Sequence, residues 1–282
     1  MDFKIKDKVL IKCVREEFSG EAVIPDDVEV IGNNSFTGRD KIKSISIPDS
    51  VVRIGINAFA DCINLESINI PESVTEIGSG AFRRCIKLTD ISIPKTVSNI
   101  GASAFSGTAW LESHNEKFVV AGNNVLIKYN GNDENVIIPQ GIKVIGESVF
   151  CCKNMRSVSI PDSVEYIGNS AFFDCENLES VTVPESVKCI GSQVFAGCIN
   201  LKTAHIPDSV SERGVYVFAD CTSLDSIMRL KYTGDSNFNV TNGNIYSVIA
   251  VEKDFDGKDV YRIIDNNLED RIYSADLFEK EY

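Results

Sequence analysis

The chain has 282 residues, of which 43% are hydrophobic and 24% charged, a composition typical of a folded globular protein and not of a disordered or collagen-like one. Its formal net charge of −13 disfavours binding to nucleic acid or to anionic membranes, because phosphate recognition depends on clustered Lys and Arg. Apolar stretches are interrupted every few residues, so none approaches the ~20 residues that span a bilayer, and we expect no membrane insertion.

The first 22 residues are predicted to form a hairpin that caps the rest of the fold. Phe3 to Lys12 reads FKIKDKVLIK, which lacks the continuous apolar region and small-residue cleavage site of a secretory signal. A cap at this end covers strand edges that otherwise invite aggregation. The compartment stays unknown: cytoplasmic as the chain is written, and cell surface or secreted if the chain is a trimmed form.

Eight prolines share one register and mark a repeat. Each follows Ile or Val, and neighbours are 22 or 23 residues apart except across one 45-residue interval. The positions are Pro25, Pro48, Pro71, Pro94, Pro139, Pro161, Pro184 and Pro207. A fixed period of this size predicts a solenoid, in which each unit buries its apolar face against its neighbours. We predict repeats over residues 23–113 and 136–230, within a solenoid that covers residues 1–230.

One complete repeat, residues 65–87, is predicted to form two short strands and a turn. Ile68 and Ile70 alternate with polar residues and are predicted to face inward. Pro71 ends this strand because it has no N–H for a ladder, and a second apolar pair follows before Gly78. Glycine recurs at this place in every copy, which predicts either a positive φ or a close approach to the next coil.

A phenylalanine follows Ala, Ser or Val in every repeat, and stacked coils are predicted to align the rings into a buried spine. The rings belong to Phe36, Phe59, Phe82, Phe105, Phe150, Phe172, Phe195 and Phe218. Five cysteines stand three residues after such a ring, which favours a ladder of small, buried, reduced thiols. They are Cys62, Cys85, Cys175, Cys198 and Cys221. Cys151 and Cys152 adjoin in a repeat shortened by one residue, and we expect no reactive thiol there.

Residues 65–85 read L-x-x-I-x-I-P-x-x-V-x-x-I-G-x-x-A-F-x-x-C, and copies cover roughly residues 23–231. This pattern resembles the BspA-like, or Treponema pallidum type, leucine-rich repeat. The resemblance implies a mainly β fold: a right-handed leucine-rich-repeat solenoid, curved into an arc, with a parallel sheet on its concave side and short helical or irregular turns. It also implies kinship with bacterial surface or secreted proteins implicated in adhesion to host matrix proteins or other bacteria.

The outward side chains of the concave strands are the first candidate binding surface. They are Ser44, Ser46, Ser67, Asn69, Asp90, Ser92, Ser157, Ser159, Ser180, Thr182, Thr203 and His205. All are short or polar, and the strip lacks the Trp, Tyr and Arg residues that favour interface hot spots. A solvated sheet face without a partner is therefore the alternative interpretation.

The 45-residue interval contains a second hairpin, which we place in a joint at residues 114–135. Phe118 and the run Val125 to Lys128 repeat the Phe and Val-Leu-Ile-Lys of the N-terminal hairpin around a Gly-Asn turn, so the chain is a larger duplication. Trp110, the single tryptophan, and His114 stand where the repeat breaks. They form either a plug for the irregular joint or part of an exposed binding patch.

The repeat ends near residue 230, after which we predict a connector at 231–244 and a small β-barrel-like module at 245–282. Tyr261 to Asp265, Glu269-Asp270 and Leu277 to Glu279 resemble the small Src-homology-3-like barrels of some bacterial proteins. Asp254 to Gly257 resembles the start of a calcium loop, but Asp265 stands where the twelfth-position Glu is expected, so a turn is favoured. A module this short is expected to pack against the last repeat.

No catalytic or metal-binding constellation stands out. The two histidines lie in different halves without zinc-site spacing, and no G-x-S-x-G elbow or phosphate loop is present. We expect no enzyme activity, no cofactor and no metal. The predicted function is a non-catalytic protein-interaction scaffold, with adhesion to a host matrix or bacterial surface protein implied by the family. The alternative is an intracellular regulatory module, or one that presents a peptide or glycan, acting through its C-terminal domain.

Overall fold

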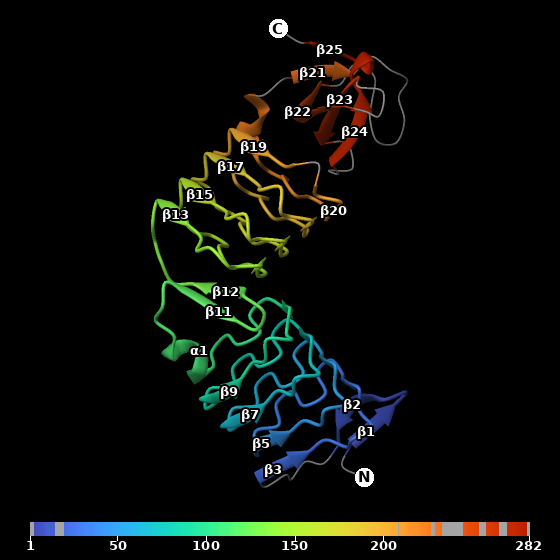
Figure 1. Ribbon diagram of the computed structural model, residues 1–282, viewed down its shortest axis with the longest axis vertical. Helices are drawn as coiled ribbons and strands as arrows, with labels where there is room; N and C mark the ends of the chain where they lie inside the picture. The colour runs from blue at the N-terminus through green and yellow to red at the C-terminus, as the bar shows by residue number, and fades with distance from the viewer. Residues whose placement is uncertain are drawn as a thin grey trace. The chain divides into compact units, whose positions relative to one another are not determined.

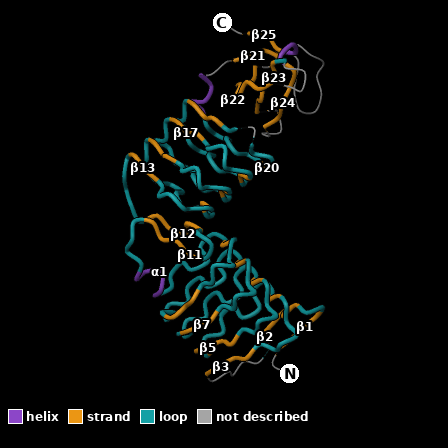
Figure 2. The backbone as a smooth tube through the Cα atoms, in the orientation of Figure 1, coloured by secondary structure: helices purple, strands orange, loops and turns teal. Residues whose placement is uncertain are grey.

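The computed structural model describes residues 3–14, 20–207, 209–226, 229–232, 245–253, 258–264 and 270–280. The chain divides into two compact units, Met1–Asn130 and Gly131–Tyr282 (Figure 1). In each unit short strands alternate with turns and stack coil upon coil, and helix is almost absent (Figure 2). Among the described residues, no helix has both the length and the apolar character needed to cross a membrane.

The first unit contains a sheet that begins with a hairpin and continues with two-residue parallel strands. Its order is β1-β2-β4-β6-β8-β10. The strands are β1 (Phe3–Lys6), β2 (Val9–Cys13), β4 (Val30–Ile31), β6 (Arg53–Ile54), β8 (Glu76–Ile77) and β10 (Asn99–Ile100). A second, wholly parallel sheet consists of β3 (Gly20–Val23), β5 (Ile42–Ser46), β7 (Ser67–Asn69) and β9 (Asp90–Ser92). The unit ends with helix α1 (Ala109–Ser113) and the antiparallel hairpin β11 (Phe118–Ala121) and β12 (Val125–Tyr129).

The second unit repeats this plan. One parallel sheet contains β13 (Asn135–Ile137), β15 (Ser157–Ser159), β17 (Ser180–Thr182) and β19 (Thr203–His205). The two-residue strands are β14 (Val144–Ile145), β16 (Tyr166–Ile167), β18 (Cys189–Ile190) and β20 (Glu212–Arg213), and they also pair in parallel. A 3-10 helix, η1 (Thr222–Ser226), follows the last coil. The predicted mainly β solenoid with parallel sheets is confirmed.

A five-stranded antiparallel sheet ends the chain, in the order β24-β23-β22-β21-β25. Its elements are β21 (Arg229–Tyr232), β22 (Ile245–Lys253), β23 (Asp259–Ile264), β24 (Asp270–Ser274), the 3-10 helix η2 (Ala275–Leu277) and β25 (Phe278–Lys280). Since β21 lies inside this sheet, the sheet begins before the predicted boundary at residue 230. The resemblance to Src-homology-3-like barrels stays a prediction. Most of the predicted connector and the Asp254 to Gly257 turn lie outside the described residues.

The predicted inward and outward alternation is confirmed in the complete repeat. Ile68, Ile70 and Ile77 are buried, whereas Asn69 between them is exposed. After Pro71 the chain turns, and the N–H of Val74 donates to the Pro71 carbonyl (3.0 Å). Burying an aliphatic side chain contributes about 1.5–3 kcal/mol, so the recurring apolar positions explain why each coil needs a neighbour on both sides.

The predicted phenylalanine spine is also confirmed, as one stack in each unit. Ring centroids are 5.0, 5.3 and 5.4 Å apart along Phe36, Phe59, Phe82 and Phe105. They are 5.0, 5.3 and 5.6 Å apart along Phe150, Phe172, Phe195 and Phe218. These spacings suit aromatic pairs, so the rings stabilise the stack beyond the area they bury.

The recurring glycine is required for close approach and not for a positive φ. A Cβ at Gly78 would lie 2.7 Å from the backbone C of Gly55 and from the backbone N of Ile56, both in the preceding coil. Positive φ occurs two residues later, at Asn57 in one coil and Gly80 in the next. The left-handed conformation that we allowed for at the glycine therefore belongs to the following turn.

Two backbone hydrogen-bond ladders join the coils and point in opposite directions. On the phenylalanine side, the N–H of Phe59 donates forward to the carbonyl of Ala81 (2.8 Å). On the two-residue strands, the N–H of Gly78 donates backward to the carbonyl of Ile54 (2.8 Å). At the start of the first unit, the hairpin serves both ladders: Cys13 N–H donates to the Ser35 carbonyl and the Leu10 carbonyl accepts from Gly32, which supports the capping role.

Candidate functional site

The outward polar residues of the first unit form two rows across the sheet β3-β5-β7-β9. Strand register aligns Ser44 with Ser67 and Ser67 with Asp90. It also aligns Ser46 with Asn69 and Asn69 with Ser92. All six side chains are exposed or half-buried, so the predicted outward orientation is confirmed, while binding by them stays a prediction.

The second unit carries the corresponding rows. Ser157 aligns with Ser180 and Ser180 with Thr203, and Thr182 aligns with His205. Ser157 and Asn135 of the neighbouring strand also share a side-chain hydrogen bond (2.6 Å). The predicted residues of this unit, which include Ser159, are exposed or half-buried and lie on one sheet.

In each unit, one of the two rows of outward residues begins with an aliphatic side chain that was not among the predicted site residues. Val23 aligns with Ser46 and is 61% exposed, and Ile137 aligns with Ser159 and is 73% exposed. Both stand two residues before the repeat proline, in the column that holds Ser, Asn, Thr or His in later coils. Aligning the repeats in columns therefore identifies Val23 and Ile137 as the aliphatic residues of an otherwise polar column. An exposed aliphatic residue within a polar strip can act as an anchor for a partner.

Beside the sheet of the second unit lies a polar groove of about 390 Å³. It is lined by Glu134, Asn154, Arg156, Asn177, Glu179, Asn200 and Lys202. Each charged residue of the groove directly precedes a strand of this sheet. The sign of the charge alternates from one coil to the next. This groove was not predicted from the sequence, although the repeats aligned in columns show the order Glu, Arg, Glu, Lys.

Ion pairs organise the charged row. Arg156 donates to Glu179 Oε1 from Nε (3.0 Å) and from Nη2 (2.5 Å), and Lys202 Nζ lies 3.7 Å from Glu179 Oε2. The hydrogen bond from Arg156 lowers the pKa of the Glu179 carboxyl, and the same contact raises the pKa of Arg156. This contact therefore favours the charged forms of both Glu179 and Arg156.

An amide row runs parallel to the charged row. Asn177 Nδ2 donates to Asn154 Oδ1, and Asn200 Nδ2 donates to the backbone carbonyl of Glu176 (2.9 Å). All three asparagines are exposed. The groove thus offers amide donors and acceptors next to fixed charges, a combination suited to the main chain and polar side chains of a peptide or protein.

Trp110 and His114 make internal contacts at the end of the first unit. The Trp110 ring lies 5.0 Å from the Phe105 ring at 61°, so it terminates the phenylalanine stack edge-on. The backbone N–H of Trp110 donates to the Leu88 carbonyl (2.7 Å). His114 packs on the indole at 4.6 Å, and its Nδ1–H donates to the Trp110 carbonyl (2.7 Å). Both side chains are half-buried, which supports the plug over the exposed patch.

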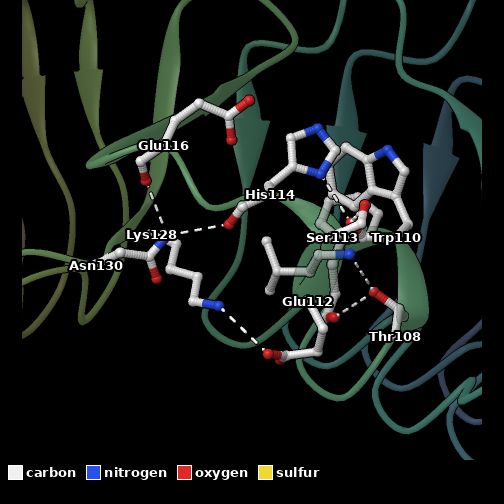
Figure 3. A network of polar contacts seen from close by, with 10 residues as sticks. Thr108, Trp110, Glu112, Ser113, His114, Glu116, Lys128 and Asn130 are labelled. Carbon is white, nitrogen blue, oxygen red and sulfur yellow. Dashed lines mark hydrogen bonds and ion pairs between the residues drawn. The ribbon is translucent and has the colours of Figure 1, made fainter.

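Polar contacts fix the segment around this plug (Figure 3). The Thr108 hydroxyl accepts from Leu111 N–H as the N-cap of α1 and donates to the Phe105 carbonyl. Asn130 Nδ2 donates to the carbonyls of His114 and Glu116, and Lys128 lies 3.7 Å from Glu112. Short-range bonds within the chain therefore hold the turn from the last coil into the hairpin.

The repeat that builds both units decides the family. The model of the BspA type leucine rich repeat region matches in six copies, over residues 5–125 and 143–253, which together exceed half of the chain. The chain belongs to the BspA-type leucine-rich repeat family. Repeats of this kind typically serve protein interaction or adhesion, and their solenoid is typically a non-enzymatic scaffold.

The chain is similar to several bacterial proteins of solved structure. A T. pallidum leucine-rich repeat protein is 24% identical, with 78% of this chain and 86% of that chain covered and a TM-score of 0.32. The pneumococcal vaccine antigen PcpA is also 24% identical, with 72% and 60% covered and a TM-score of 0.39. A leucine-rich repeat protein of Bacteroides ovatus is 24% identical, with 73% and 59% covered and a TM-score of 0.36. The chain thus spans about three fifths of the last two proteins. No curated protein matches it.

The BspA-type cysteine column is buried, as predicted. Each ladder thiol donates to the carbonyl of a spine phenylalanine in the preceding coil, for example Cys85 to Phe59 (3.1 Å) and Cys221 to Phe195 (3.0 Å). Burial raises the pKa of the Cys175 thiol well above its usual range, which keeps it protonated. Within the described parts of the chain, no group of three His, Cys, Asp or Glu side chains is arranged to hold a metal ion.

Proposed function

We propose that this BspA-type protein is a non-catalytic scaffold that binds a protein partner through one face of its second unit. This binding face comprises the outward residues Ile137, Ser159, Thr182 and His205 together with the groove residues Arg156, Glu179 and Lys202. The observation that carries the proposal is the adjacency of a polar groove with fixed charges and a sheet that begins with a highly exposed isoleucine.

The composition of this face suits protein recognition. Arg is enriched at interface hot spots, and Arg156 supplies the residue type that the outward strip lacks. Interfaces combine an apolar centre with a polar rim, which Ile137 and the neighbouring hydroxyl and amide groups provide. Adhesion to a host matrix or bacterial surface protein is the family-level part of the proposal, and no catalytic step belongs to it.

Charge reversal in the groove tests the proposal. Purified wild-type protein is screened by surface binding against matrix proteins and bacterial surface proteins, and any ligand is then titrated against variants. Glu179→Lys and Ile137→Asp should each weaken binding at least about tenfold, equivalent to about 1.4 kcal/mol. Glu165→Lys is the matched control, because Glu165 pairs with Lys143 (3.8 Å) outside the groove. Equal binding by Glu179→Lys and Glu165→Lys would contradict the assignment.

The C-terminal sheet supports the second candidate, a module that itself binds a peptide or glycan. Its five antiparallel strands form a sheet separate from the parallel ladders. A chain truncated after Ser226 removes this sheet entirely, whereas truncation at residue 230 would leave part of β21 behind. Retained binding by the truncated chain favours the face of the second unit, and lost binding with intact circular dichroism favours the C-terminal module.

A further inference from the structure

The nine cysteines fall into two groups that differ in access. Six are buried, whereas Cys151 and Cys189 are half-buried and Cys152 is exposed. Cys151 and Cys152 are adjacent in sequence and occupy the first phenylalanine-bearing coil of the second unit. No contact described above for the binding face uses either thiol.

The pair lies at surface positions of its coil, one and two residues after Phe150, where the next coil has the half-buried Phe173 and Asp174. Met155 stands five positions after Phe150, whereas its counterpart in the next coil, Leu178, stands six positions after Phe172. Lys153 stands where Cys175 does in the next coil: its N–H donates to the Phe150 carbonyl (3.1 Å), as that of Cys175 donates to the Phe172 carbonyl (3.2 Å). Cys152 adopts the left-handed conformation (φ 56°) of the turn, as Asp174 does one coil later (φ 52°).

The backbone holds the two thiols together. Cys152 N–H donates to the Phe173 carbonyl (2.8 Å), and Cys151 N–H donates to the Ser148 carbonyl (3.2 Å). The two Sγ atoms lie 3.2 Å apart. A disulfide needs about 2.05 Å, so the sulfurs have roughly one ångström to close.

We propose that Cys151 and Cys152 form a redox-active vicinal dithiol, which closes reversibly to a disulfide by exchange with low-molecular-weight disulfides. The exposed Cys152 thiolate attacks one sulfur of the small disulfide; a protein–small-molecule disulfide forms and one small thiol leaves with a proton. Cys151 then releases its proton and attacks Cys152 Sγ, which expels the second small thiol. Two protein thiols are oxidised by two electrons, and one small disulfide is reduced to two thiols.

The order of attack follows from the surroundings of the two thiols. Cys152 is exposed and reaches the small disulfide first, whereas Cys151 is half-buried. Burial and the hydrogen bond with Cys152 also raise the pKa of Cys151 to about 11, so little of Cys151 is thiolate at neutral pH and it acts second. Reversal is favoured because Cα atoms across one trans peptide are about 3.8 Å apart, below the 4.4–6.8 Å usual for disulfides. Strained, exposed disulfides are the readily reduced class.

The test uses the full chain, reduced and then equilibrated with glutathione disulfide and glutathione at graded ratios. Free thiols are trapped with N-ethylmaleimide and the protein is digested with trypsin. Both cysteines fall in one peptide, Val144–Lys153, so closure is detected as loss of two hydrogens with no attached reagent. Closure should rise with the disulfide fraction and reverse with dithiothreitol, while the thiols of Cys62 and Cys85 remain reduced.

Two single variants separate the steps. Cys151→Ser should retain glutathione on Cys152, because no second thiol can expel it, and Cys152→Ser should remain largely unmodified at Cys151. Circular dichroism confirms that both variants are folded. Two results would overturn the proposal: wild-type protein that stays reduced at every ratio, or wild-type protein that accumulates the glutathione adduct without closing.

Discussion

Coil position sets the environment of individual side chains in this protein. Cys175 and Cys189 are the same residue type only 14 positions apart, yet one is sealed in the ladder and the other lies half-buried on a two-residue strand. Cys189 Sγ donates to Glu212 Oε2 (3.3 Å) in the next coil. Burial and this hydrogen bond raise the pKa of Cys189 to about 11.

Removing the carboxylate should make Cys189 more reactive. The ordinary thiol pKa is 9.0, so at pH 8 Cys189 is mostly protonated both in the wild-type protein and in a variant that lacks the carboxylate. A higher pKa leaves a smaller fraction of Cys189 as the reactive thiolate. Glu212→Gln lowers the pKa toward 9.0 without reversing the effect of burial. The rate at which iodoacetamide labels Cys189 is measured by peptide mass spectrometry between pH 7 and 11. At pH 8 the variant should be labelled faster than the wild-type protein, and the inflection of its rate against pH should lie at a lower pH. Labelling of Cys152 provides the internal control, and unchanged Cys189 labelling would contradict the role of Glu212.

At the scale of the element, the phenylalanine spine dominates the stability of each stack. Phe172 packs between Phe150 and Phe195, both within 5.3 Å between centroids. Phe172→Ala should lower the free energy of unfolding by about 3–5 kcal/mol, as measured by urea denaturation. Phe173→Ala is the matched control, because Phe173 is half-buried and alanine occupies its position in the next coil, Ala196. Phe173→Ala should lower the free energy of unfolding by less than about 1 kcal/mol. Equal losses of stability in the two variants would count against a stabilising role of the spine.

Features that follow from the pattern of residues within one repeat were predictable from the sequence. Features that depend on contacts between stacked coils or distant strands were harder to predict. Ile68, Ile70 and Phe82 follow patterns visible in one repeat, and the structure buries all three. The groove was missed because its charges, such as Arg156 and Glu179, form a row only once coils stack. The role of Gly78 was left between two explanations because backbone clearance from the preceding coil is a tertiary quantity. Strand β21 was missed because Arg229 to Tyr232 has no repeat signature and pairs only with strands distant in the sequence.

At the scale of the whole molecule, the chain contains two stacks of coils besides its C-terminal sheet, and each stack should respond separately to damage. Solenoid stability is approximately a sum of terms between neighbouring repeats. Trp110→Ala removes the ring that terminates the first stack and should cost roughly 2 kcal/mol, less than the 3–5 kcal/mol of a fully buried aromatic residue.

Hydrogen exchange locates the effect. Trp110→Ala should lower protection of the Phe82 amide, which donates to the Ala104 carbonyl (2.7 Å), and leave the Phe172 amide of the second unit unchanged. Trp110→Phe, which keeps an aromatic ring, should recover most of the protection. If Trp110 served an exposed patch instead, exchange would be unaffected while partner binding was lost.

The two opposed ladders bear on how long such a protein can grow. In an α-helix all peptide dipoles add, and the partial charges of the macrodipole gather at the two ends. Here the amides of Phe36, Phe59 and Phe82 point toward the C-terminal end of their stack, while those of Gly55, Gly78 and Gly101 point toward the N-terminal end. Their dipoles largely cancel in every coil. Extra coils therefore add buried area without accumulating opposite electrostatic poles, so repeat number can change in this architecture without an electrostatic penalty that grows with length.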